Sequence, residues 1–322
     1  MATIETAHHV QVAPDGWNGT SVPILTASAA GAAEREAGRL ARLAGVLRRT
    51  LRTRFAGFGL GAAVVFLFCA VTAGVLAPYD PVHQDYGAVL EAPSWKHPFG
   101  TDDLGRDVLS RVIHGSRVSL QAGVVAVAFA VAVGVLLGLT AGYWGGLTDE
   151  ALMRVTDALY SFPALLLALA ITAALGPSLT NVILAVGIVL TPVFARLVRG
   201  QALSVKEQEF VAAARAAGAG HWRIMRRHIW PNVTAAIIVQ ASLTVAFGII
   251  YEAALSFLGV GVRPPTPSWG SMLRVGYTYL EGAPWLAFFP GAAIFFSVLA
   301  FNFLGDGLRE ALDPRLRQPG ES

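Results

Sequence analysis

Long apolar stretches dominate the chain, and shorter polar stretches separate them. Six of the apolar stretches are about 20 residues or longer, which is enough for an α-helix to cross a hydrocarbon core about 30 Å thick. Their approximate limits are 56–77, 118–143, 156–175, 179–198, 233–258 and 285–304. Helices are expected because lipid cannot satisfy backbone polar groups. The pattern therefore predicts an all-α integral membrane protein with six transmembrane helices.

The composition also indicates a membrane protein rather than a soluble one. Of the 322 residues, 54% are hydrophobic and 14% are charged, and the mean hydropathy is +0.56. Soluble globular chains usually carry about 25% charged residues. The one cysteine, Cys69, lies inside the first apolar stretch. No disulfide can therefore form within the chain.

The polar segments divide the chain into regions. Residues 1–33 show no hydrophobic periodicity and are predicted to form a disordered tail. Residues 34–54 place leucines on one helical face with arginines around it, which is typical of a basic amphipathic helix next to the membrane. A basic flank that only orients the first span fits equally well. The expected remaining regions are the first transmembrane helix with its outer loop, the core transmembrane domain and a cytoplasmic C-terminal tail, at 55–117, 118–306 and 307–322.

The distribution of Lys and Arg predicts the orientation of the spans. Cytoplasmic loops carry an excess of these residues in membrane proteins. With the N-terminus in the cytoplasm, most of the 24 Lys and Arg residues fall on the inner side. The residues left on the outer side are Lys96, Arg106, Arg111, Arg117, Arg263 and Arg274. Both termini are therefore predicted to be cytoplasmic.

A polar insert at 204–232 separates the fourth and fifth apolar stretches. Its first half is rich in helix formers and its second half is basic. We expect a helix from about Val205 to Ala217, followed by a turn at Gly218. The chain has no Gly-x-x-x-x-Gly-Lys-Ser/Thr phosphate loop, so ATP is not expected to bind by that route. We expect the insert to be the segment on which a separate motor protein acts. The alternative is an amphipathic helix on the inner membrane surface.

The loop after the first span contains a dense charged motif. Residues 98–111 read PFGTDDLGRDVLSR, with acids three or four positions before arginines. Opposite charges at that spacing can pair on a helix. The candidate functional residues of the motif are Gly100, Thr101, Asp102, Gly105, Arg106, Asp107 and Arg111.

Glu252 is the only acid well inside an apolar stretch. A charge at the bilayer centre costs about 2.5–3.5 kcal/mol on insertion scales. Glu252 lies near the outer end of its span, where we expect water to reach it. It is a candidate gate or pore residue, and a structural hydrogen bond is the alternative.

Small residues recur every fourth position in the second apolar stretch, at Gly134, Gly138 and Gly142. This spacing lets helix backbones approach each other closely. We predict that the stripe packs against another helix of this chain rather than against a second copy of it.

Four segments in order resemble the inner-membrane permeases of bacterial ABC importers. The resemblance is to the dipeptide, oligopeptide and nickel branch, and within it to the C-type permease. The segments are 98–111, 204–232, 255–270 (LSFLGVGVRPPTPSWG) and 305–315 (GDGLREALDPR), and the match covers about 48–317. The resemblance implies the type I importer permease fold with a cytoplasmic coupling helix. It also implies a location in the bacterial plasma (inner) membrane.

By this resemblance, the polar insert is the EAA loop, whose helix docks on a cytoplasmic ATPase subunit. The Glu-Ala-Ala triplet of the family falls on Ala212 to Ala214, so alanine stands at the acidic position. Glu209 or Arg215 would then make the charged contact. The residues implied for coupling are Glu209, Phe210, Ala212, Ala213, Ala214, Arg215, Gly218 and Pro231.

The resemblance further implies ATP-driven import of di- or oligopeptides by alternating access. The implied partners are a second homologous permease in a heterodimer, two cytoplasmic ATPase subunits that hold ATP and Mg²⁺, an extracytoplasmic binding protein, and lipid. No enzymatic activity and no bound cofactor are expected of this chain. The basic insert has one aromatic residue, Trp222, and lies against the membrane, so nucleic-acid binding is not expected. Alternatives are a permease for nickel or another small solute, an ion-coupled secondary carrier, or a non-transporting scaffold.

Overall fold

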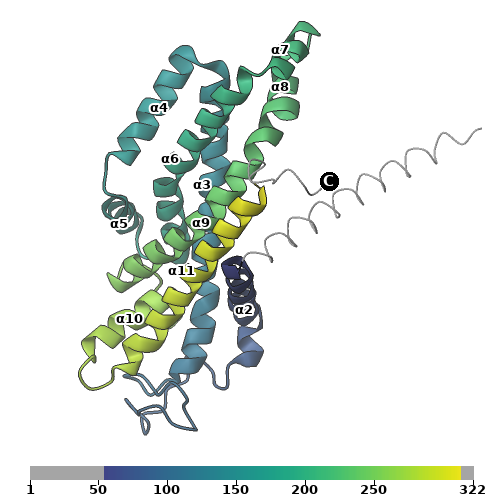
Figure 1. Cartoon of the computed structure of the whole chain (residues 1–322). Coiled ribbons are helices and arrows are strands. Elements are labelled where there is room, and N and C mark those ends of the chain that lie inside the picture. The colour runs from purple at the N-terminus through teal and green to yellow at the C-terminus, as the bar shows by residue number, and fades with distance from the viewer. Residues whose placement is uncertain (1–53, 313–322) are drawn as a thin grey trace, which may run out of the picture. The chain divides into compact units, whose positions relative to one another are not determined.

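A computed structural model describes residues 54–312 of the chain (Figure 1). Within that range the chain is helical, and its only β-type pairing is an isolated bridge between Thr101 and Asp107. The tail predicted at 1–33 and nearly all of the amphipathic helix predicted at 34–54 lie outside the described residues.

Five helical segments are long and apolar enough to cross a membrane. Four are α2 (Arg54–Leu76), α3 (Val108–Trp144), α6 (Leu179–Lys206) and α11 (Trp285–Leu312). The fifth runs without a break through α8 (His221–Ile224), the π-helical turn η1 (Met225–Ile229) and α9 (Trp230–Phe257).

These segments confirm five of the six predicted spans, although their ends differ from the expected limits. α3 begins at Val108 and not near 118, because Asp107 caps its first turn through a hydrogen bond from the Ser110 amide. The loop before α3 therefore ends at Asp107, ten residues before the expected limit at 117. At the other end of the chain, α11 continues beyond 306 to Leu312.

The prediction of one continuous helix over 156–175 is wrong. α4 (Gly146–Tyr160) and α5 (Ala164–Leu175) replace it, and they meet at an angle of 89°. The bend falls at Pro163, which has ψ of 122° and precedes α5. A residue directly before proline avoids the helical region, so Phe162 cannot continue α4. Taken together, α4 and α5 are long and apolar enough for one span, so the pair is either a broken sixth span or a re-entrant loop.

The glycine stripe of α3 packs against α6, which confirms the predicted packing within this chain and identifies the partner helix. A Cβ atom added to Gly138 would lie 2.5 Å from the carbonyl oxygen of Ala195, and one added to Gly134 would lie 2.6 Å from the Cβ of Phe194. Gly142 faces Ala202 in the same way, at 2.8 Å. Side chains at these positions would force the two backbones apart. α3 and α6 therefore form the central helix pair.

The remaining helices pack around this pair. α9 packs against α3, α6 and α11, and α2 packs against α3 and α11. Figure 1 places α8 and α7 (Glu209–Ala216) at one end of the helices. It places α10 (Trp269–Thr278) and the loop between α2 and α3 at the other end.

Candidate functional site

The polar insert contains a short helix, α7, which follows α6 after a break at Glu207 and Gln208. The expected helix from Val205 is wrong at its start, because residues 205–206 complete α6. α7 ends before Gly218, whose φ is +78°. Glycine adopts this left-handed conformation at the lowest cost, and it commonly ends helices.

Most of the surface of α7 is exposed. Val211 is fully buried, in a cluster that includes Val205 of α6, Ile224 of α8 and Ile229 of η1. Phe210, in contrast, is 41% exposed. Other exposed residues of α7 are Glu209, Ala212, Ala213 and Arg215, whereas Ala214 is half-buried. α7 is therefore anchored mainly through Val211 and presents most of the rest of its surface outward.

Exposed cations lie on α7 and on the α8–η1 segment that follows it. They are Arg215, Arg223, Arg226 and Arg227, which we call the cationic cluster. No salt bridge joins any of them to another residue between 54 and 312. Pro231 follows the cationic cluster in the chain, in the first turn of α9 and just after the π-helical turn η1. Proline has no amide hydrogen to donate to the preceding turn, which suits a change of helical register there.

The helix that carries three of these four arginines is longer than a membrane is thick. His221–Phe257 contains 37 residues, which at about 1.5 Å per residue is about 55 Å, against about 30 Å for a hydrocarbon core. The arginines Arg223, Arg226 and Arg227 all lie in its first turns. Because arginine is costly in hydrocarbon, we infer that the excess length is at the α8 end and that α7 lies beyond the hydrocarbon.

The charged motif at 98–111 folds into a turn whose charges are buried. Asp102 accepts hydrogen bonds from Arg106 Nε at 2.7 Å and also pairs with Arg111 Nε at 3.3 Å. These three residues are only 4%, 7% and 6% exposed. The predicted pairing of Asp102 and Asp103 with Arg106 is confirmed. Its expected location on a helix is wrong, because Gly105 has φ of +71° and α3 begins only at Val108.

The same motif joins the loop to two helices. Asp107 accepts from the Ser110 amide at 2.8 Å and pairs with His97 Nδ1 at 2.9 Å. The Trp285 indole at the start of α11 donates to the Thr101 carbonyl at 3.2 Å. A Cβ at Gly100 would come within 2.7 Å of that indole. We call the five buried titratable residues of this region the charged lock: His97, Asp102, Arg106, Asp107 and Arg111.

Glu252 is fully buried, so the expectation that water hydrates it is wrong. Its carboxyl oxygens accept hydrogen bonds from Ser119 of α3 and Ser256 of α9, each at 2.7 Å. The Trp269 amide lies 3.4 Å from the Ser119 hydroxyl. The carboxyl group thus joins α9 to α3, and the Trp269 amide joins α10 to the same serine.

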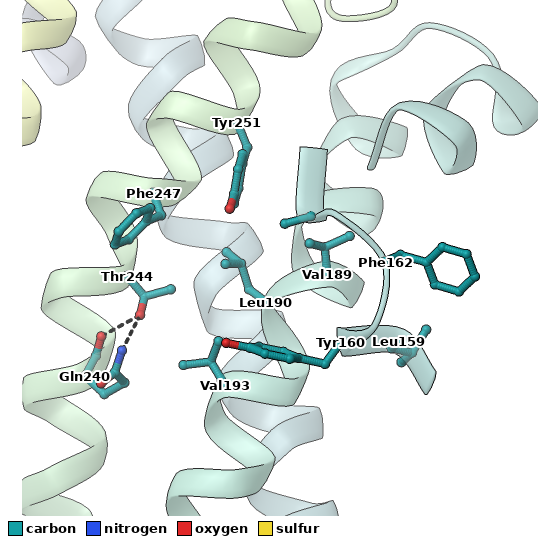
Figure 2. Close-up of a pocket in the computed structure, with 11 residues that line it drawn as sticks. Leu159, Tyr160, Phe162, Val189, Leu190, Val193, Gln240, Thr244, Phe247 and Tyr251 are labelled. Atoms are coloured by element: carbon teal, nitrogen blue, oxygen red, sulfur yellow. Dashed lines mark hydrogen bonds between the residues drawn. The ribbon is translucent and has the colours of Figure 1, made fainter. Parts of the chain in front are cut away.

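A cavity of about 370 Å³ lies at the bend between α4 and α5, with α6 and α9 completing its walls (Figure 2). Tyr160, Phe162, Gln240, Thr244 and Tyr251 contribute its aromatic and polar lining. None of these was predicted as a site residue. The available signal was Gln240, a polar residue in the middle of an apolar stretch.

Comparison with known proteins identifies the family. The family model "Binding-protein-dependent transport system inner membrane component" matches residues 134–318. This chain belongs to that family. A second model, "N-terminal TM domain of oligopeptide transport permease C", matches residues 42–93 of the permease.

Curated relatives match most of the permease. A dipeptide transport system permease of Alkalihalophilus pseudofirmus is 44% identical over 266 residues, covering 83% of this chain and 88% of the relative. A glutathione transport system permease of Pectobacterium atrosepticum is 46% identical over 272 residues, covering 84% and 90%. A di/tripeptide transport system permease of Pseudomonas aeruginosa is 45% identical over 265 residues, covering 80% and 88%.

A solved structure shows the same fold. An inward-facing structure of the MetNI methionine ABC transporter aligns with a TM-score of 0.52 and 19% identity, covering 63% of this permease and 96% of that chain. The permease therefore has the type I fold of ABC importers, as the sequence motifs predicted. It is a multi-span transport permease of the inner membrane.

Proposed function

We propose that the permease forms one half of a pore for short peptides, and that ATP hydrolysis on separate cytoplasmic subunits drives import. A second homologous permease supplies the other half of the pore. Two ATPase subunits hold ATP and Mg²⁺, and an extracytoplasmic binding protein delivers the substrate. The names of the dipeptide, di/tripeptide and glutathione relatives support a peptide substrate. Nickel or another small solute is the alternative within this branch.

The observation that carries this proposal is the exposure of α7. Its position beyond the hydrocarbon suits a soluble partner, and its short alanine side chains leave room for close packing. Phe210 provides an exposed aromatic anchor of the kind that dominates protein interfaces. We therefore assign α7 as the coupling helix, with Arg215 and Glu209 available for charged contacts where the family has an acid at 212.

The buried contact of α7 explains how movement reaches the spans. Val211 packs with Val205 at the end of α6 and with Ile224 at the start of the helix that becomes α9. A displacement of α7 therefore acts on α6 and α9 together. The same two helices form walls of the cavity at the α4–α5 bend. A partner can shift the spans between two states only if its contacts with α7 differ between those states.

The proposal places both chain termini in the cytoplasm. The Lys and Arg distribution supports this orientation, because it assigns most of these residues, including the cationic cluster, to the cytoplasmic side. The charged lock and α10 then face the binding protein.

Replacement of Phe210 by Ala tests the docking role. We expect about 30-fold weaker co-purification with the ATPase subunits, which corresponds to a loss of about 2 kcal/mol at an interface hot spot. ATP-driven peptide uptake by reconstituted vesicles should fall with it. The amount of folded permease in the membrane should change little, because Phe210 is 41% exposed and the His228 ring near it is 6.1 Å away, centre to centre. Glu209→Arg tests the charged contact in the same assay.

Tyr86→Ala is the matched control, because Tyr86 is an aromatic residue that is 74% exposed in the loop at the opposite end. This variant should bind the ATPase subunits as the wild type does. Normal ATPase binding and normal uptake by both Phe210→Ala and Glu209→Arg would refute the assignment of α7.

A further inference from the structure

The cavity at the α4–α5 bend is lined by polar atoms that have no hydrogen-bond partner among residues 54–312. Gln240 donates through Nε2 to the Thr244 hydroxyl at 3.1 Å, and that hydroxyl donates to the Gln240 backbone carbonyl at 2.7 Å. The side-chain oxygen of Gln240 has no hydrogen-bond partner among residues 54–312. The hydroxyl groups of Tyr160 and Tyr251 also have none in that range.

Two of these groups, the Gln240 carboxamide and Tyr160, are held in place. Figure 2 shows the Tyr160 hydroxyl pointing toward Gln240 and Thr244, whereas Phe162 projects away from them. The Arg196 guanidinium lies 4.1 Å from the centre of the Tyr160 ring, and it also pairs with Asp157 at 2.7 Å. The two hydrogen bonds between Gln240 and Thr244 orient the carboxamide in turn. The cavity is therefore preorganised for a ligand.

The lining contains no formal charge: aliphatic and aromatic side chains form the rest of the wall. Polar residues inside spans are rare, and they typically mark substrate pathways. A lining without charge would not hold the termini of a zwitterionic peptide tightly. A neutral carboxamide, in contrast, offers one acceptor and one remaining donor. This pair complements the N–H and C=O of a peptide bond, which every peptide contains whatever its side chains.

We propose that the cavity is a contact site for the substrate during its passage, and that Gln240 recognises a peptide bond. The Gln240 side-chain oxygen accepts from the peptide N–H, and its second amide hydrogen donates to the peptide carbonyl. Thr244 orients Gln240, and the Tyr160 ring forms a wall of the site. The inference rests on the proposed function and extends it to a particular site and chemical group.

A substrate with an ester in place of the peptide bond tests the proposed contact with Gln240. A depsipeptide, in which an ester replaces the amide, keeps the shape of a dipeptide but has no N–H to donate to Gln240. Uptake of a dipeptide and of its ester analogue is measured with the complete reconstituted transporter at saturating loaded binding protein. Because the binding protein is the same throughout, its own preference cancels when variants are compared. The readout is the ratio of amide to ester uptake.

Gln240→Leu should lower this ratio about fivefold, the effect of one lost hydrogen bond of about 1 kcal/mol. Thr244→Val is nearly isosteric and should lower the ratio by a smaller factor, because it releases the carboxamide without removing it. The matched control is Gln121→Leu in α3, which removes an exposed glutamine outside the cavity. This control should leave the ratio at the wild-type value.

A wild-type ratio in both Gln240→Leu and Thr244→Val would overturn the inference, even if total uptake fell. A wild-type transporter that imports no peptide at all would instead refute the proposed function, and the inference with it. These two failures are distinguishable, because only the first leaves peptide uptake by the wild type intact.

Discussion

The two charged regions of the permease, at opposite ends of its helices, are built in opposite ways. In the charged lock, Asp102, Arg106 and Arg111 are nearly inaccessible and pair with one another. In the cationic cluster, Arg215 and Arg226 are exposed and have no ion pair within the described range. The sequence indicates a functional motif in both regions. The difference in exposure shows that the charged lock organises the permease, whereas the cationic cluster is available to a partner.

The energetic consequences of the two arrangements differ. Burying a charge is expensive, and loss of one partner leaves the other charge buried without compensation. An exposed arginine is hydrated, and it contributes little to the stability of the fold. Substitutions in the charged lock should therefore affect folding. Substitutions in the cationic cluster and α7 should affect binding.

The largest effect is expected for Asp102→Ala. The change leaves the Arg106 and Arg111 guanidinium groups buried without their shared carboxylate, at a cost of about 3–5 kcal/mol. Thermal unfolding of the purified permease in detergent should shift to a clearly lower temperature, and the yield from membranes should fall.

Asp103→Ala is the control. The side chain of Asp103 is 26% exposed, and its contact with Arg106 is long, at 3.5 Å. Its loss should therefore cost less than about 1 kcal/mol. Equal shifts for both variants would contradict the buried lock.

A smaller effect is expected for Gly218→Ala, beyond the end of α7. The φ of +78° at Gly218 disfavours any side chain by about 1 kcal/mol. We expect about fivefold weaker binding of the ATPase subunits, because the turn that presents α7 becomes strained. Gly220→Ala is a close control, since Gly220 has φ of −66° and open space around its Cα. If the two variants bound the ATPase subunits equally well, the geometry of this turn would not matter for docking.

The smallest effect is expected from salt, without any substitution. Raising the ionic strength from about 0.1 M to 1 M shortens the Debye length from about 10 Å to 3 Å. Contacts of the cationic cluster with an ATPase subunit should weaken by a few-fold in co-purification. The unfolding temperature should barely change, because the residues of the charged lock are only 3–7% exposed and buried ion pairs are screened little by salt. A salt-sensitive unfolding temperature together with salt-insensitive docking would reverse the comparison.

Several features of the permease could be predicted from sequence because their causes are local. Five spans follow from apolar stretches of sufficient length. The packing of Gly138 against α6 follows from the spacing of small residues. The existence of a helix near Glu209 follows from helix formers, and its end follows from Gly218.

Other features could not be predicted, because they depend on residues that are distant in sequence. Ser119 and Glu252 are 133 positions apart, so nothing near Glu252 in the sequence indicated that its carboxyl group is fully enclosed. The bend at Pro163 was missed because a proline near the start of an expected helix is usually tolerated. The polar lining of the cavity combines Tyr160 from α4 with Gln240 from α9, and no sequence spacing connects them.

Five of the six spans and the family of the chain could be inferred from sequence alone. A helix in lipid satisfies its own backbone, so the approximate position of a span depends mainly on nearby residues. The burial of Glu252, the sharp bend between α4 and α5, and the uncharged cavity at this bend became visible only in the packed helices. Burial and cavities arise from the packing of several helices, and packing joins residues that the chain keeps far apart.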